Sequence, residues 1–185
     1  MACAAVLALA ACAPISKPID VAALERSKPR TILLVISRGT ELSGVVDPTP
    51  AVAHTVGGAF AARLSLTLST MIETYNNSVP ARGATPLAPR ARPAADLELE
   101  IRTLVWGIGI DPNQHMSLQS KASLRLLDRR TSAELTSGEG RVGVPLPESM
   151  AGWGGRPRTD SPFLALAAQQ AAEQCRQKLD NLLGV

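Results

Sequence analysis

Aromatic residues are scarce in this sequence, where two Phe, two Trp and one Tyr make up only 3% of 185 residues. Hydrophobic residues still amount to 45%, so the interior must be built mainly from Leu, Val, Ile and Ala side chains. Such a core offers few rings on which a planar ligand can stack. The chain length fits a single domain with enough residues to bury a substantial core.

Histidine and excess charge are also scarce, which argues against several classes of function. His54 and His115 lie in no HExxH or His–Cys pattern, so the sequence supports no metal site. His115 with Asp111 offers part of a Ser-His-Asp site, but without a G-x-S-x-G motif a surface histidine is the favoured interpretation. A net charge of +3 is too small and too scattered for a nucleic-acid-binding surface. We therefore predict no metal, no cofactor, no nucleic-acid partner and no enzymatic activity.

The N-terminus carries the strongest signal in the sequence. Residues 4–11 form an apolar stretch, well short of the roughly 20 residues that a membrane-spanning helix needs. The stretch ends in Leu9, Ala10, Ala11 and Cys12, which resemble the lipobox of bacterial lipoproteins: an apolar residue, two small residues and the thiol that becomes the lipidated N-terminus. We expect residues 1–11 to be a signal peptide and Cys12 to carry acyl chains that hold the protein on a membrane. An ordinary cleavable signal peptide and a buried N-terminal helix are the alternatives. No Lys or Arg precedes the apolar stretch, so the sequence departs from the pattern in lacking a basic n-region.

The same cleavage leaves one cysteine in the mature chain. Cys3 is removed with the signal peptide and Cys12 is acylated, so no intramolecular disulfide is expected. Cys175 has neighbours with a helical pattern, which favours a buried small hydrophobe over a reactive thiol.

The mature chain begins with a predicted tether. Residues 12–29 contain Pro14, Pro18 and Pro29 and few large apolar residues, which is typical of a linker. Residues 31–36 then form a continuous apolar run, which predicts a strand covered on both faces.

A long helix is predicted next. Thr49 is the expected N-cap and Pro50 the first helical residue, and apolar residues then recur at three- and four-residue intervals as far as Tyr75. Gly57 and Gly58 would weaken this helix, so close packing against a sheet is their expected role. A phosphate-binding turn is the less favoured alternative, because no strand leads directly into these glycines.

Two loops of unusual composition are candidate contact sites. Residues 79–95 are rich in Pro and Arg, including Arg90 and Arg92, and predict a mobile basic loop. Contact with anionic envelope polymers or lipid headgroups is its functional interpretation, and a solvated linker is the favoured one. Trp153 lies among glycines in a second long loop, where its ring is a candidate partner contact, although such rings more often pack on their own domain.

Alternating apolar and polar residues predict three strands in succession, within residues 97–106, 116–126 and 135–144. Glu98, Glu100 and Arg102 share one face of the first of these strands. A solvated face explains them better than a carboxylate pair for acid–base chemistry. A terminal helix that begins at Pro162 is expected to place these residues on one face: Leu164, Ala168, Ala171, Cys175, Leu179 and Leu182.

Together these elements predict an α+β fold in the order β-α-β-β-β-α. Two helices are expected to pack on one face of a mostly antiparallel sheet of about four strands. The predicted division of the chain is a signal peptide at residues 1–11, a lipidated tether at 12–29 and a single α+β domain at 30–185.

Three segments together resemble an uncharacterised family of proteobacterial envelope lipoproteins. They are residues 95–103 with Trp106, the hairpin at 120–138, and residues 171–176. The shared motifs are patterns of strands, so the resemblance implies a location and a fold but no reaction. Ala13 follows the lipidated cysteine where inner-membrane retention typically uses Asp, so the resemblance also implies the outer membrane.

The favoured function is that of a non-enzymatic envelope lipoprotein, a partner-binding or assembly-accessory component at the periplasmic face of the outer membrane. Its expected partners are the membrane, through the N-terminal lipid, and an envelope protein, with Trp153, Arg90 and Arg92 as candidate contacts. An accessory lipoprotein that carries a lipid or another ligand for an envelope transport system is the alternative, and a hydrolase with a dispersed site ranks third. A deep apolar cavity between helices and sheet would favour the carrier, whereas a filled core with an exposed strand edge would favour strand addition.

Lipidation is directly testable. We expect the substitution Cys12→Ala to abolish metabolic labelling of the protein with a fatty-acid analogue, because the alanine side chain has no thiol to acylate. Labelling that persists at the wild-type level in this variant would rule out Cys12 as the lipidation site.

Overall fold

The computed structural model describes residues 19–38, 47–74, 92–113, 115–147 and 162–184. The elements along the chain are α1 (Val21–Ser27), β1 (Thr31–Arg38), α2 (Thr49–Arg63), β2 (Thr67–Thr74), β3 (Leu97–Ile110), β4 (Met116–Asp128), β5 (Ala133–Pro145) and α3 (Pro162–Leu183). The lipobox with Cys12, and the candidate contacts Arg90 and Trp153, lie outside the described residues.

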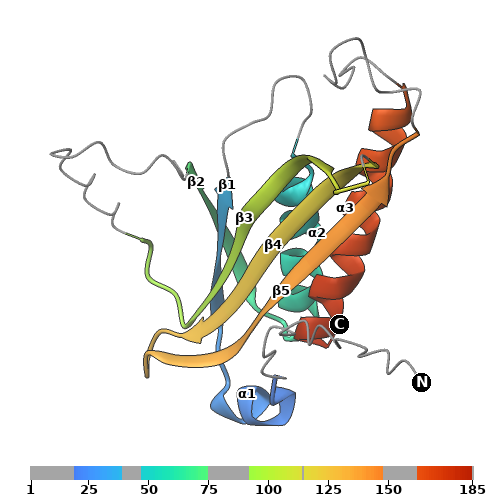
Figure 1. Ribbon diagram of the computed structural model, residues 1–185. Helices are drawn as coiled ribbons and strands as arrows, with labels where there is room; N and C mark the ends of the chain where they lie inside the picture. The colour runs from blue at the N-terminus through green and yellow to red at the C-terminus, as the bar shows by residue number, and fades with distance from the viewer. Residues whose placement is uncertain (1–18, 39–46, 75–91, 114, 148–161, 185) are drawn as a thin grey trace, which may run out of the picture.

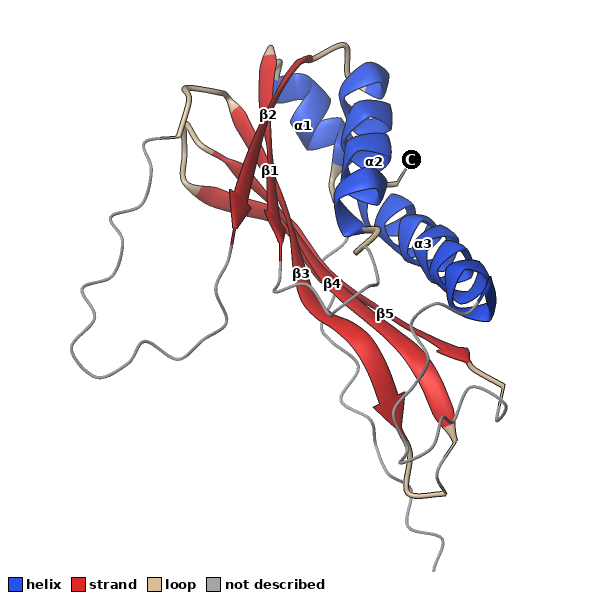
Figure 2. Cartoon of the chain, turned by 90° about the horizontal axis from the view of Figure 1, so that it is seen from above, coloured by secondary structure: helices blue, strands red, loops and turns tan. Residues whose placement is uncertain are grey.

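The five strands form one mixed sheet in the order β2-β1-β3-β4-β5. β1 pairs in parallel with β2 and with β3, whereas β3, β4 and β5 form an antiparallel meander. Helices α2 and α3 lie on the same face of the sheet, and the ends of β3 and β4 project beyond α3 (Figure 2). The predicted α+β class is confirmed, with β2 as an additional strand and α1 as an additional short helix (Figure 1).

The apolar run at residues 31–36 forms the centre of the sheet, as predicted. Five consecutive side chains, Ile32 to Ile36, have no exposed surface. Side chains alternate between the faces of a strand, so β1 is covered on both sides. Ile32, Leu34 and Ile36 join the core beneath the helices, and Leu33 and Val35 lie on the opposite face.

The predicted long helix is wrong beyond Arg63, where α2 ends. Ser65 adopts a left-handed conformation with φ of 53°, and the amide of Leu66 donates to the carbonyl oxygen of Ala61 at 2.8 Å. The chain then returns as β2. Apolar residues keep a spacing of three or four through this junction, whereas the Thr-rich composition of β2 favours a strand.

The N-terminus of α2 is capped differently from the prediction. The helix begins at Thr49, and the carboxylate of Asp47 accepts a hydrogen bond from the Thr49 amide at 2.9 Å. The other oxygen of Asp47 accepts a hydrogen bond from the Thr103 hydroxyl at 2.7 Å. Pro48 is therefore the N-cap in place of Thr49, and Asp47, one residue before it, binds the first amide of α2 and links the helix to β3.

Helices and sheet are in close contact at two glycines. A Cβ atom on Gly57 of α2 would lie 2.9 Å from Cδ2 of the fully buried Leu34, and one on Gly138 of β5 would lie 2.7 Å from Cδ2 of Leu182 in α3. The packing role predicted for Gly57 is confirmed. Gly58 has no neighbour within 4 Å of such a Cβ, so packing does not explain it.

Helix α3 begins at Pro162 and presents its predicted apolar face to the sheet. Leu164, Ala171, Cys175 and Leu179 are all buried in the core. Burial raises the pKa of the Cys175 thiol to about 11, with a contribution from Asp47 in the same direction and one from Lys178 in the opposite direction. The prediction that Cys175 is a buried small hydrophobe is confirmed.

The described part of the predicted tether is folded. Helix α1 occupies residues 21–27, Leu24 is only 4% exposed, and Ile19 packs against the core. Folded residues therefore extend ahead of the boundary predicted at residue 30.

A β-bulge interrupts the alternation of β3. The register with β4 shifts between Thr103 and Val105, which turns Trp106 to the buried side, where it is 6% exposed, and leaves Val105 43% exposed. Strict alternation over residues 97–106 would place Val105 on the apolar face and Trp106 on the wetter one. That prediction is wrong after Thr103, because the bulge shifts the alternation by one residue.

The two adjacent glycines of α2 offer a matched test of the helix–sheet contact. Gly58→Ala should raise the free energy of unfolding by about 1 kcal/mol, because alanine favours the helix and nothing lies in its way. In Gly57→Ala the added methyl group meets the side chain of Leu34. We therefore expect the free energy of unfolding of this variant to be at least about 1 kcal/mol below that of Gly58→Ala. Denaturant unfolding measures both, and equal gains from the two substitutions would contradict the close approach.

Candidate functional site

The sheet face opposite the helices carries a dense set of charged side chains. Rows of residues run across the strands on this face: Leu33 pairs with Glu98, Val35 with Glu100, and Ser37 with both Glu73 and Arg102. We refer to this surface as the open face.

Arg92 is the centre of an ion-pair network on the open face. Its guanidinium donates to Glu73 of β2, with Nε–Oε1 and Nη2–Oε2 distances of 3.2 and 3.1 Å, and it also contacts Glu98 and, at 3.9 Å, Glu100 of β3. Because β1 lies between β2 and β3, this side chain bridges across β1. Burial disfavours the charged form of Arg92, but the hydrogen bond to Glu73 and the charges of the three carboxylates outweigh it and raise the pKa of Arg92.

Glu98 is held from two sides. Its side chain is 5% exposed and contacts both Arg92 and, at 3.6 Å, Arg129. Arg129 in turn donates a hydrogen bond to the carbonyl oxygen of Pro93. The prediction of a solvated face is therefore wrong for Glu98, because Arg92, from the segment before β3, and Arg129, from the turn after β4, cover it.

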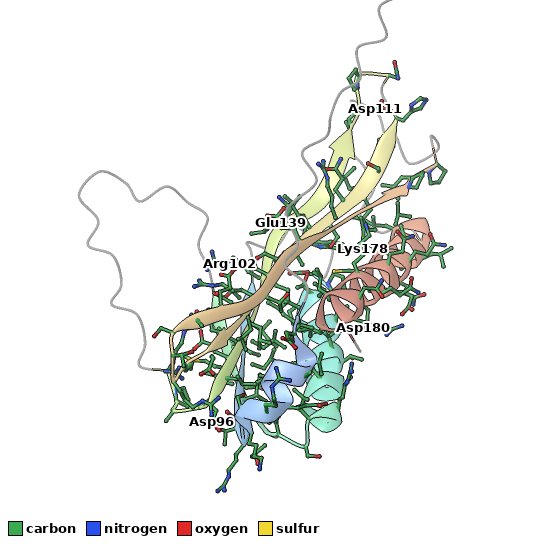
Figure 3. The ribbon with its side chains drawn as sticks, turned by 90° about the horizontal axis from the view of Figure 1, so that it is seen from below. Asp96, Arg102, Asp111, Glu139, Lys178 and Asp180 are labelled. Carbon is green, nitrogen blue, oxygen red and sulfur yellow. The ribbon has the colours of Figure 1, made fainter. Side chains whose placement is uncertain are left out.

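A shallow hollow of about 360 Å³ lies beside this network on the open face. Its lining consists of Glu100, Arg102, Ser123, Leu124, Arg125, Ser137, Gly138 and Glu139. The charged members are paired: Arg102 with Glu100 at 3.1 Å, Arg125 with Glu134 at 3.0 Å, and Glu139 with Lys121 at 2.7 Å. Figure 3 shows Arg102 and Glu139 on this surface. A lining in which opposite charges are already matched is not selective for an ion of either sign.

The two outer strands of the sheet differ in how their edges are protected. β5 carries Gly138, Gly140, Gly143 and Pro145 together with charged residues, which are features that discourage pairing with another strand. β2 has the sequence TLSTMIET, without Gly, Pro, Lys or Arg, and its single charged residue, Glu73, is bound by Arg92. Ile72 of β2 is 46% exposed. Within the described residues no strand pairs with the outer edge of β2.

The turn between β3 and β4 lies at the far end of the sheet from Asp96 (Figure 3). Asp111 accepts a hydrogen bond from the backbone amide of His115 at 2.8 Å, which is the largest cause lowering the pKa of Asp111, and its other oxygen lies 3.2 Å from His115 Nδ1. His115 is largely exposed at 67%. The pair fastens a turn, as expected of a surface histidine.

The described residues contain no group of three or more His, Cys, Asp or Glu side chains that could hold a metal ion. None of their helices combines the length and the apolar composition needed to cross a membrane.

The structure places one of the predicted contact residues, Arg92, and gives it an intramolecular role in the ion-pair network. Its contact with a partner stays a prediction, as do the roles of Cys12, Arg90 and Trp153. The edge of β2 was missed by the sequence analysis because β2 itself was assigned to a helix. Its threonine content is the signal that could have identified it.

No protein-family model and no curated protein matches the sequence. The chain is similar in structure to protein XCC0632 of Xanthomonas campestris, with a TM-score of 0.47, 14% identity and coverage of 82% of each chain. It is also similar to the PelC dodecamer of Paraburkholderia phytofirmans, with a TM-score of 0.42, 13% identity and coverage of 84% of this chain and 88% of that one. For lipoprotein GNA1162 of Neisseria meningitidis the TM-score is 0.39, the identity 17%, and the coverage 79% of this chain and 97% of that one. Bacterial lipoproteins are thus among the structural neighbours, and at these TM-scores and identities the likeness is one of fold alone.

The contribution of the Arg92 network to stability can be measured with a matched pair. Arg92→Met should lower the free energy of unfolding by about 2 kcal/mol. The substitution leaves the buried Glu98 with one cation instead of two and removes the ion-pair link between β2 and β3. Arg141→Met, at an exposed arginine of β5 outside this network, should change it by no more than about 0.5 kcal/mol. Equal effects of the two substitutions in denaturant unfolding would show that the network does not stabilise the fold.

Proposed function

We propose that this protein is a non-enzymatic, lipid-anchored envelope protein that binds a partner protein by strand addition to the outer edge of β2. The anchor is Cys12 of the sequence Leu9-Ala10-Ala11-Cys12, and the location is the periplasmic face of the outer membrane, by the resemblance noted at Ala13. Residues 1–11 are then a signal peptide, removed before the protein reaches its site.

The observation that carries the binding mode is the unprotected edge of β2. An edge strand presents a row of backbone N–H and C=O groups that can pair with another chain, and native proteins usually block such rows with charge, proline or bulges. β5 has these features and β2 does not. An added strand would also cover part of Ile72, which is 46% exposed.

Close helix–sheet packing favours partner binding over the carrier function. A carrier needs an apolar cavity for its cargo, and the space between the two layers is the expected place for one. At Gly57 and Gly138 the layers approach so closely that a single methyl group would meet a buried leucine or one packed on the core. The core between these points is filled by side chains of α2, α3 and the sheet.

The edge is tested by paired substitutions in intact cells. Ile72 of β2 and Leu166 of α3, which is 54% exposed, are each replaced by a photo-crosslinking residue. We expect a discrete crosslinked partner protein from position 72 and none from position 166. Ile72→Lys should lower recovery of that partner about tenfold, because a lysine on an edge disfavours strand pairing, whereas Leu166→Lys should leave it unchanged. Identical adducts from both positions, or no loss with Ile72→Lys, would refute binding at β2.

A further inference from the structure

One end of the molecule gathers α1, the turn that leads into β1, and the C-terminal end of α2 (Figure 1). A hollow of about 310 Å³ lies between these elements, lined by Glu25, Lys28, Pro29, Arg63, Leu64 and Ser65. Lys28 and Ser65 both have positive φ, 48° and 53°, at the positions where the chain turns out of α1 and α2. These turns bring the ends of two helices, each with a basic residue, to one place.

Four cations at this end are exposed: Arg26, Lys28, Arg30 and Arg63. We call them the basic end. Within the described residues none of the four forms an ion pair, and Lys28 and Arg63 share the lining of the same hollow. This distinguishes them from the arginines of the open face and of α3, which are bound to carboxylates.

The acidic residues nearby offset this charge only in part. Asp128 is bound by Arg130 at 3.0 Å, and Asp96 accepts hydrogen bonds from the backbone amides of Arg30 and Thr31 at 2.7 and 3.1 Å. Those amide bonds, with burial acting in the opposite direction, lower the pKa of Asp96. Glu25 is exposed and lines the hollow, so it opposes part of the charge of Lys28 and Arg63. Asp20, directly before α1, is a further carboxylate at this end, and it also has a partner. Within the described residues, the five cations Arg26, Lys28, Arg30, Arg63 and Arg130 outnumber the four carboxylates Asp20, Glu25, Asp96 and Asp128.

The position of the basic end in the chain decides what it faces. Six residues lie between Cys12 and Ile19, which packs against the core, and the seven Cα–Cα steps from one to the other span at most about 25 Å when fully extended. A lipid on Cys12 would therefore keep α1 within that distance of the bilayer surface. The negative potential of anionic lipids extends over about one Debye length, roughly 8 Å at physiological salt, so a basic surface held this close can reach it.

We propose that the basic end binds anionic phospholipid headgroups in the leaflet that holds the lipid anchor, with Lys28 and Arg63 binding a headgroup phosphate at the hollow. This rests on the proposed lipidation of Cys12. Binding at this end orients the molecule: Asp96 lies near the start of β1, and Asp111 lies at the opposite end of the sheet, so the turn between β3 and β4 points away from the bilayer (Figure 3). A lipid together with a basic surface also gives the two signals that stable membrane attachment requires.

The test uses residues 12–185, the proposed mature chain, with Cys12→Ala so that no lipid is attached. Its binding is measured by sedimentation with vesicles of phosphatidylcholine alone or with about one third phosphatidylglycerol. We expect binding to the anionic vesicles that weakens with salt. The combined substitutions Arg26→Ala, Lys28→Ala, Arg30→Ala and Arg63→Ala should reduce it at least about tenfold. Arg141→Ala removes an exposed arginine at another site and should leave binding unchanged.

Two further measurements keep the outcome decisive. A second variant, Lys28→Glu with Arg63→Glu, tests the hollow itself and should abolish binding while its circular dichroism spectrum stays that of the parent chain. Equal binding to neutral vesicles, or equal binding of the four-alanine variant and the parent chain, would overturn the proposal. Because none of these chains carries a lipid, failure here is distinct from failure of Cys12 labelling, which tests the anchor.

Discussion

β1 is buried on both faces, and the remainder of the structure provides the cover that this strand needs. Helix α2 covers Ile32, Leu34 and Ile36 on one side. Leu33 and Val35 on the other side are equally buried, yet neither helix lies there. Arg92 bridges from Glu73 on β2 to Glu98 on β3 across this part of β1. The ion-pair network therefore shares a face with these two buried side chains, and long charged residues can cover apolar surface with their methylene groups while their charges are paired.

The elements that follow from local pattern were predictable, and those that depend on distant residues were not. β1 is a continuous apolar run, whereas β4 and the apolar face of α3 each show a single period of hydrophobicity, and all three were found where the pattern placed them. β2 was missed because helical spacing of apolar residues continues past Arg63, while the helix ends in a left-handed serine, Ser65, instead of the glycine that usually signals such an end. The bulge after Thr103 has no sequence signature either, because it is defined by pairing with β4.

The candidate surfaces show the same division. The alternation of Glu98, Glu100 and Arg102 fixes which face they share, but an alternating polar face looks alike whether water or arginine covers it. Arg129 reaches Glu98 only because β3 and β4 are neighbours in the sheet. Arg92 bridges β2 and β3 only because these strands flank β1 on its two sides. That β2 is an outer strand, unpaired on one side within the described residues, follows from the strand order of the whole sheet. No local pattern in residues 67–74 contains that order.

The two proposed contacts are compatible because they use different parts of the molecule. The basic end groups residues that precede β1 with the end of α2, close in sequence to the predicted anchor, whereas strand addition uses the outer edge of β2 along its length. β2 begins four residues after Arg63, so a strand added there would have one end beside the basic end and the other end away from it. A partner strand bound in this way would run from the bilayer surface into the periplasm, and its register along β2 would set its height above the membrane.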